Sequence, residues 1–152
     1  MDRIGRGVIA GFLATLILSG VVDPMTTIAR TADVLSTTFG WMLHFIVGSL
    51  VWGASFALLE KRLFGPLWLR GLVFGFLAWL VVMLAVMPLT RGDWFGLALG
   101  VATPVTMLAI HLIYGAMLGA FYSLLDPEAP EHERGALGAP DVHRPRLHSA
   151  HR

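Results

Sequence analysis

The chain has 152 residues, of which 56% are hydrophobic and 14% are charged, whereas soluble domains carry about 25% charged residues. The net charge of +1 gives no basis for a nucleic-acid partner, and the absence of cysteine excludes disulfides and iron–sulfur clusters. Four long stretches contain no Asp, Glu, Lys or Arg: residues 7–22, 34–59, 71–90 and 94–125. A helix needs about 20 apolar residues to cross a bilayer, so these stretches leave no room for a soluble domain.

We therefore predict an all-α, polytopic membrane protein whose transmembrane domain covers residues 1–125. The four transmembrane helices are expected at about residues 5–23, 40–59, 70–89 and 104–125. Thr103 and Pro104 form a typical helix start, and Pro88 lies where the third helix is expected to stop. Residues 126–152 are polar and rich in proline, which predicts a disordered cytoplasmic tail.

The first and third predicted helices share a sequence pattern, and so do the second and fourth. The aligned segments are 7–25 with 71–89, 44–48 with 111–115 and, after one residue of slippage, 53–59 with 119–125. The pattern predicts two tandem helical hairpins that point the same way, which is a parallel repeat. Because cleavage would remove one copy of the repeat, we interpret the first stretch as a permanent span and not as a signal peptide.

Basic residues are unevenly distributed between the two ends of the predicted spans. One side carries Arg3, Arg6, Lys61, Arg62 and Arg70, and the loops of the other side carry Arg30 and Arg91. Cytoplasmic loops are enriched in Lys and Arg, so this asymmetry predicts that both termini are cytoplasmic. The expected location is the bacterial inner membrane.

Small residues recur at four-residue spacing along the predicted helices. In lipid, such spacing lets helix backbones approach closely and so favours helix association. The predicted helix-packing residues are Gly7, Gly11, Gly48, Gly53, Gly71, Gly75, Gly115 and Gly119. Most of these contacts are expected inside the bundle, although one pair could instead face a partner protein or a second copy of the chain within the lipid bilayer.

His44 and His111 are the candidate ligand residues, because they are the ionisable residues nearest the interior of their spans. They occupy aligned positions in the repeat, and each is followed four residues later by a glycine. The first interpretation is structural, a polar contact between helices. The second is a pair of axial ligands to haem b, since imidazole ligates haem iron. A proton relay or a quinone contact is a third interpretation.

The sequence also resembles a family of small prokaryotic membrane proteins that is designated only as a domain of unknown function. The resemblance is carried by RIGRGVIAGFLAT at 3–15 and HLIYGAMLGAFYSLL at 111–125. It covers about residues 3–125, implies the four-helix architecture and transfers no catalytic residue.

The chain carries no recognisable catalytic motif and no metal-binding motif, so we expect no enzymatic activity. The leading hypothesis is a non-catalytic accessory subunit of a larger membrane complex, with an electron-transport assembly, respiratory or photosynthetic, as the first choice. The expected partners are membrane-protein subunits or further copies of the chain. The alternatives are a b-type haem protein that uses His44 and His111, and a small transporter or permeability factor.

Overall fold

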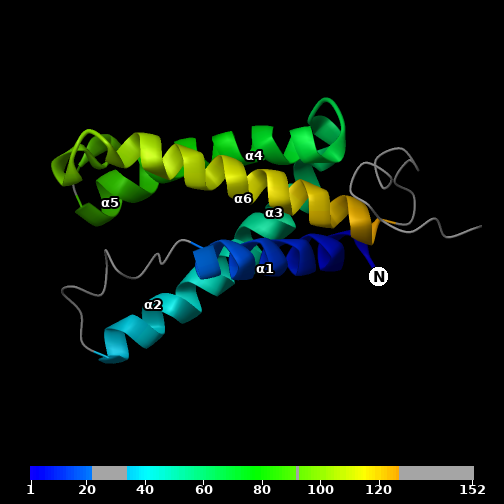
Figure 1. Ribbon diagram of the computed structural model, residues 1–152, viewed down its shortest axis with the longest axis horizontal. Coiled ribbons are helices and arrows are strands. Elements are labelled where there is room, and N and C mark those ends of the chain that lie inside the picture. Colours follow the sequence, from blue (N-terminus) through cyan, green and yellow to red (C-terminus); the bar gives the residue numbers. More distant parts are fainter. Residues whose placement is uncertain (22–33, 92, 127–152) are drawn as a thin grey trace, which may run out of the picture.

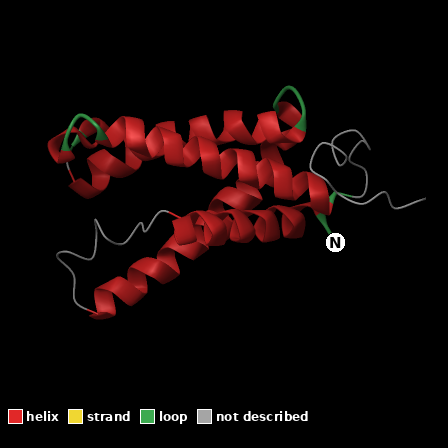
Figure 2. Ribbon diagram, viewed as in Figure 1, coloured by secondary structure: helices red, strands yellow, loops and turns green. Residues whose placement is uncertain are grey.

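The computed structural model describes residues 1–21, 34–91 and 93–126, and among these residues the regular structure is helical, without strands (Figure 2). The α-helices are α1 (Arg3–Val21), α2 (Val34–Ile46), α3 (Ala54–Leu59), α4 (Leu67–Val81), α5 (Met87–Arg91) and α6 (Thr103–Leu125). Two π-helical segments, η1 (Val47–Gly53) and η3 (Val82–Val86), and two 3₁₀ segments, η2 (Glu60–Arg62) and η4 (Trp94–Leu99), join them. Apart from Asp126, the tail predicted at 126–152 lies outside the described residues.

The described chain contains four helices that are long and apolar enough to cross a membrane. They span Arg3–Val21, Thr38–Arg62, Leu67–Leu89 and Thr103–Leu125. The predicted all-α fold with four membrane-spanning helices is therefore confirmed. A chain with four such helices is typical of a multi-pass membrane protein.

The helices form two antiparallel hairpins that lie against each other (Figure 1). In the first hairpin, α1 packs on η1 and α3 of the second span, while α2 diverges from the rest of the bundle. In the second hairpin, α4 and α6 lie side by side along most of their length. The two hairpins meet mainly through α1 and α6. This arrangement leaves α2 as the part of the spans with the least support from its own chain.

The buried core lies between α1, α3, α4 and α6. Small side chains line the face of α1, where Ala10 and Ala14 are completely buried. The ring of Phe56 packs edge-on against Phe74 and Tyr122, with centroid distances of 5.5 and 5.4 Å. Aromatic pairs prefer this arrangement, because the positive ring edge then faces a negative ring face. Large apolar side chains cover the outside of the bundle, as expected for a surface in contact with lipid.

The third membrane-spanning stretch ends at Leu89, as expected, but its helix continues through Pro88 to Arg91. The π-helical segment η3 ends at Val86, and the chain continues as α5 from Met87 to Arg91. Proline lacks an N–H and its ring crowds the carbonyl of the preceding turn, which breaks a regular α-helix. A π-turn immediately before proline changes the hydrogen-bond pattern at that point. The helix therefore passes through Pro88 and ends one turn later.

Candidate functional site

A hydrogen bond between the two hairpins forms the centre of the candidate site. The Tyr114 hydroxyl of α6 donates to the Gly48 carbonyl in η1, at 2.6 Å, and both residues are buried. The Thr15 side chain of α1 lies against Gly48, and its hydroxyl donates to the Gly11 carbonyl at 2.7 Å. Three helices therefore contribute to one polar cluster inside an otherwise apolar bundle.

The π-helical geometry of η1 explains why the Gly48 carbonyl can accept a hydrogen bond from Tyr114. A π-turn contains one more residue than an α-turn, and it disturbs the ladder of backbone hydrogen bonds. The sequence shows where this residue enters: Gly48 and Gly53 are five residues apart, whereas the aligned Gly115 and Gly119 are four apart. The one residue of slippage in the alignment thus falls inside η1. π-turns of this kind are found frequently at functional sites.

His44 makes a polar contact with α1 at the far end of this cluster. Its Nε2 lies 3.0 Å from the Ser19 hydroxyl oxygen, and that hydroxyl donates to the Thr15 carbonyl at 2.7 Å. A serine hydroxyl has only one proton to donate. The Ser19 oxygen must therefore accept from the Nε2–H of His44, which leaves Nδ1 as a bare lone pair. The rings of Trp41 and Phe45 lie 5.9 and 5.8 Å from the imidazole.

His111 uses its other ring nitrogen. Its Nδ1 lies 2.7 Å from the Met107 carbonyl one turn earlier in α6, and a carbonyl can only accept. Nδ1 therefore carries the proton, and Nε2 is left as the unprotonated nitrogen. Histidines that ligate metals commonly bind through one nitrogen while the other donates to a backbone carbonyl. The imidazole of His111 is half-buried and has this arrangement.

The two histidines differ in position as well as in hydrogen bonding. A Cβ added at Gly75 would overlap the carbonyl of His111, so His111 crosses α4 beside that glycine. His44 lies beside Ser19, about two turns along α1 from Gly11, the residue that aligns with Gly75. Aligned positions in the sequence are thus placed at different levels of their hairpins. The Nε2 of His111 is therefore unprotonated, whereas the Nε2 of His44 is engaged with Ser19.

The predicted glycines lie at close backbone contacts within each hairpin. In the first hairpin, a Cβ at Gly7 would overlap the Gly53 carbonyl, and one at Gly48 would overlap the Thr15 side chain. In the second hairpin, a Cβ at Gly71 would overlap the carbonyl of Gly115. Gly11 faces Gly48 and Gly53, Gly75 faces His111 and Gly115, and Gly119 faces the carbonyl of Leu67. That these contacts stabilise the bundle is a prediction, and substitution of the glycines tests it.

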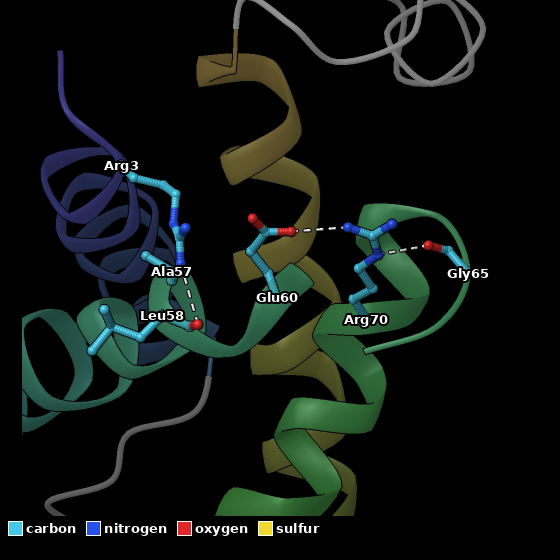
Figure 3. A network of polar contacts seen from close by, with 6 residues as sticks. All are labelled: Arg3, Ala57, Leu58, Glu60, Gly65 and Arg70. Carbon is cyan, nitrogen blue, oxygen red and sulfur yellow. Dashed lines mark hydrogen bonds and ion pairs between the residues drawn. The ribbon is translucent and has the colours of Figure 1, made fainter. Parts of the chain in front are cut away.

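A group of charged residues gathers at the end of the bundle where α1 begins, which we call the amino-terminal end. Glu60 is buried, with 4% of its surface exposed, and its Oε2 lies 2.8 Å from Nη1 of Arg70 (Figure 3). Arg6 of α1 pairs with Asp126 after α6 at 3.3 Å. The sequence analysis used Arg6 and Arg70 only as topology signals and assigned no role to Glu60 or Asp126. The position of Glu60, directly after a charge-free stretch, was the available hint of burial.

Comparison with known proteins adds a family to this description. The family described as "Family of unknown function (DUF6789)" matches residues 1–133. The chain belongs to this family. The family match covers both histidines, all the glycines named above and the charged residues of the amino-terminal end. Neither the curated proteins nor the solved structures provide a match.

Proposed function

We propose that this DUF6789 member is a non-catalytic accessory subunit of a larger membrane complex and that it docks through α2. The observation that carries the proposal is the lack of packing around this helix. No side chain from Thr38 to Ile46 is buried, and Phe39, Met42 and Leu43 are 64, 58 and 49% exposed. Transmembrane helices associate through close packing, because lipid gives no hydrophobic drive between them. Because α2 packs so little against its own chain, its surface is available to another membrane protein.

We place the chain in the bacterial inner membrane with both termini cytoplasmic, on the strength of the basic residues at the amino-terminal end. An electron-transport assembly, respiratory or photosynthetic, is our first choice of complex. The support for this choice is the pair of intramembrane histidines, each of which keeps one ring nitrogen as an acceptor. A complex formed from further copies of the chain is the competing arrangement.

Site-specific photo-crosslinking in native membranes tests the docking surface. A photoreactive residue is placed at Phe39, Met42 or Leu43 on α2, and the matched control is Leu77 on α4, which is 42% exposed. We expect adducts with a heterologous membrane protein from the α2 positions and only lipid adducts from Leu77. Equal yields of protein adducts at α2 and Leu77 would contradict docking through α2. Adducts with the chain itself alone would replace the accessory-subunit proposal with a homo-oligomer.

A b-type haem protein is the second candidate, because the hydrogen bond from His111 to Met107 leaves Nε2 available to iron. Purified chain from haem-sufficient cells should then show a Soret band. Loss of the band in His111→Ala with retention in His44→Ala indicates a single axial ligand from this chain. Loss in both variants indicates bis-histidine ligation, and a colourless wild-type protein eliminates the candidate. The transporter alternative needs a water-filled polar path, and no described feature supports one.

A further inference from the structure

The turn between the second and third spans separates its charges by sign. It contains Glu60, Lys61 and Arg62, which form the 3₁₀ segment η2. Glu60 points into the bundle, where Arg70 neutralises it (Figure 3). Arg70 is held in place by a second bond, from its Nε to the Gly65 carbonyl at 2.7 Å. The Glu60 carboxylate is therefore paired with Arg70 inside the bundle and does not neutralise the other charges of the turn.

Lys61 and Arg62 point the other way and are exposed. Within the described part of the chain, neither side chain has a hydrogen bond or an ion pair. The other arginines at this end are engaged. Arg6 pairs with Asp126 and Arg70 pairs with Glu60, while Arg3 donates to the carbonyls of Ala57 and Leu58 at 2.7 and 3.2 Å. Two neighbouring positive charges thus face outward, and no described carboxylate pairs with either of them.

The apolar neighbours of this turn indicate its depth in the membrane. Phe64 is 71% exposed and Trp68 is 48% exposed, and they follow Arg62 on the way into α4. Exposed aromatic rings, tryptophan above all, are enriched at the boundary between hydrocarbon and lipid headgroups. Lys61 and Arg62 therefore lie at the level of the phosphates, with an apolar surface for acyl chains next to them.

We propose that Lys61 and Arg62 bind the phosphate of an anionic phospholipid whose acyl chains lie against Phe64 and Trp68. The charge of the headgroup complements the two unpaired cations. Arginine can bind a phosphate through two parallel N–H bonds, and lysine adds a point charge. The buried pair of Glu60 and Arg70 holds the turn in the conformation that presents both cations. A zwitterionic lipid would bring its own positive group and gain less from this surface.

Native mass spectrometry of the detergent-solubilised full chain measures this preference. The probes are phosphatidylglycerol and phosphatidylcholine with identical acyl chains. The test variant is Lys61→Gln/Arg62→Gln, and the control variant Arg144→Gln/Arg146→Gln removes the same charge from the tail. Each basic residue near an anionic lipid surface contributes about a fivefold gain in affinity, so the test variant should bind phosphatidylglycerol about thirtyfold more weakly. The control variant should bind it like the wild type.

Three results would overturn the proposal. The first is unchanged binding of phosphatidylglycerol by the test variant, and the second is an equal loss in the control variant, which would mean that only net charge matters. The third is displacement of the lipid by an equal concentration of inorganic phosphate, which would indicate a site for free anions. Because both substituted side chains are exposed, the thermal midpoint of the test variant should match that of the wild type and so exclude misfolding.

Discussion

The two hairpins have similar sequences but pack differently. In the second hairpin, α4 and α6 stay in contact along most of their length, and the Gly71 backbone lies against Gly115. In the first hairpin, the Gly7 backbone lies against Gly53, which aligns with Gly119 and not with Gly115. The second helix of the first hairpin is therefore displaced by about one turn relative to its counterpart. On the N-terminal side of η1, α2 diverges from α1 and from the rest of the bundle (Figure 1).

This difference shows that a shared glycine pattern does not determine the register of a helix pair. Several glycines on each helix allow several close crossings, and the rest of the interface selects one of them. In the first hairpin the selection coincides with the extra residue of η1 and with the bond from Tyr114. The experiments below test which of these features maintains the difference between the hairpins.

The largest effect is expected at the helix crossing of the second hairpin. In Gly75→Val, the new side chain would overlap the carbonyl of His111, which is backbone and cannot rotate away. Overpacking of this kind costs about 1–3 kcal/mol. We therefore expect a loss of about 3 kcal/mol in the free energy of unfolding, measured by titration with a denaturing detergent.

Two further variants calibrate this result. Gly11→Val places its Cβ 2.7 Å from the Gly48 carbonyl and 3.0 Å from the Gly53 Cα, so it should be destabilising but less so. Gly20→Val is the control, because a Cβ there has no neighbouring atom within 4 Å, and its effect should stay within about 0.5 kcal/mol. If Gly20→Val and Gly75→Val were equally destabilising, close packing would not explain the loss.

An intermediate effect is expected from Tyr114→Phe, which keeps the ring and removes the bond to Gly48. A buried carbonyl that loses its donor costs about 1 kcal/mol in water-soluble proteins, and hydrogen bonds between transmembrane helices average about 0.6 kcal/mol. We expect faster amide hydrogen exchange in η1, with no change in η3 of the second hairpin as an internal control. Equal acceleration in both segments would mean general loosening and not the loss of a local contact.

The smallest effect is expected from Ser19→Ala, which removes the acceptor of the His44 Nε2–H. The loss in unfolding free energy should be about 0.6 kcal/mol, the average for a polar contact in a membrane. Ser123→Ala is the matched control, because that hydroxyl is buried and has no partner within the described part of the chain. The ¹⁵N shift of the His44 ring should change only in Ser19→Ala. If that shift stayed unchanged, the assigned tautomer would be wrong.

The number and the approximate positions of the spans could be predicted, because a charged side chain in lipid is costly and long charge-free runs are therefore informative. The path through Pro88 could not be predicted, since the adjoining π-turn leaves no clear mark in the sequence. The alignment of His44 with His111 also failed to indicate their different contacts. Helix rotation and register depend on the summed packing of both faces, and single aligned residues do not reveal them.

Glu60 shows the same limit for charges. In the sequence it is one of three consecutive charged residues at the end of a span, of which the Lys and Arg indicate topology and the Glu does not. Its burial follows from the position of Arg70, ten residues later, after the chain has turned back. The conformation of the following turn thus determines which residue pairs with a charge at a helix end. The order of charged residues in the sequence does not reveal that conformation.

The ion pair between Arg6 and Asp126 brings the start of α1 next to the end of α6, its antiparallel neighbour (Figure 1). A bundle whose first helix begins beside the end of its last helix can be closed there by a short linker and opened elsewhere without cutting a helix. If the new termini were placed at Gly65, between the second and third spans, the hairpin of α4 and α6 would be synthesised first. The hairpin of α1 and α2 would follow it. The order of membrane insertion can therefore be reversed while every helix keeps its neighbours.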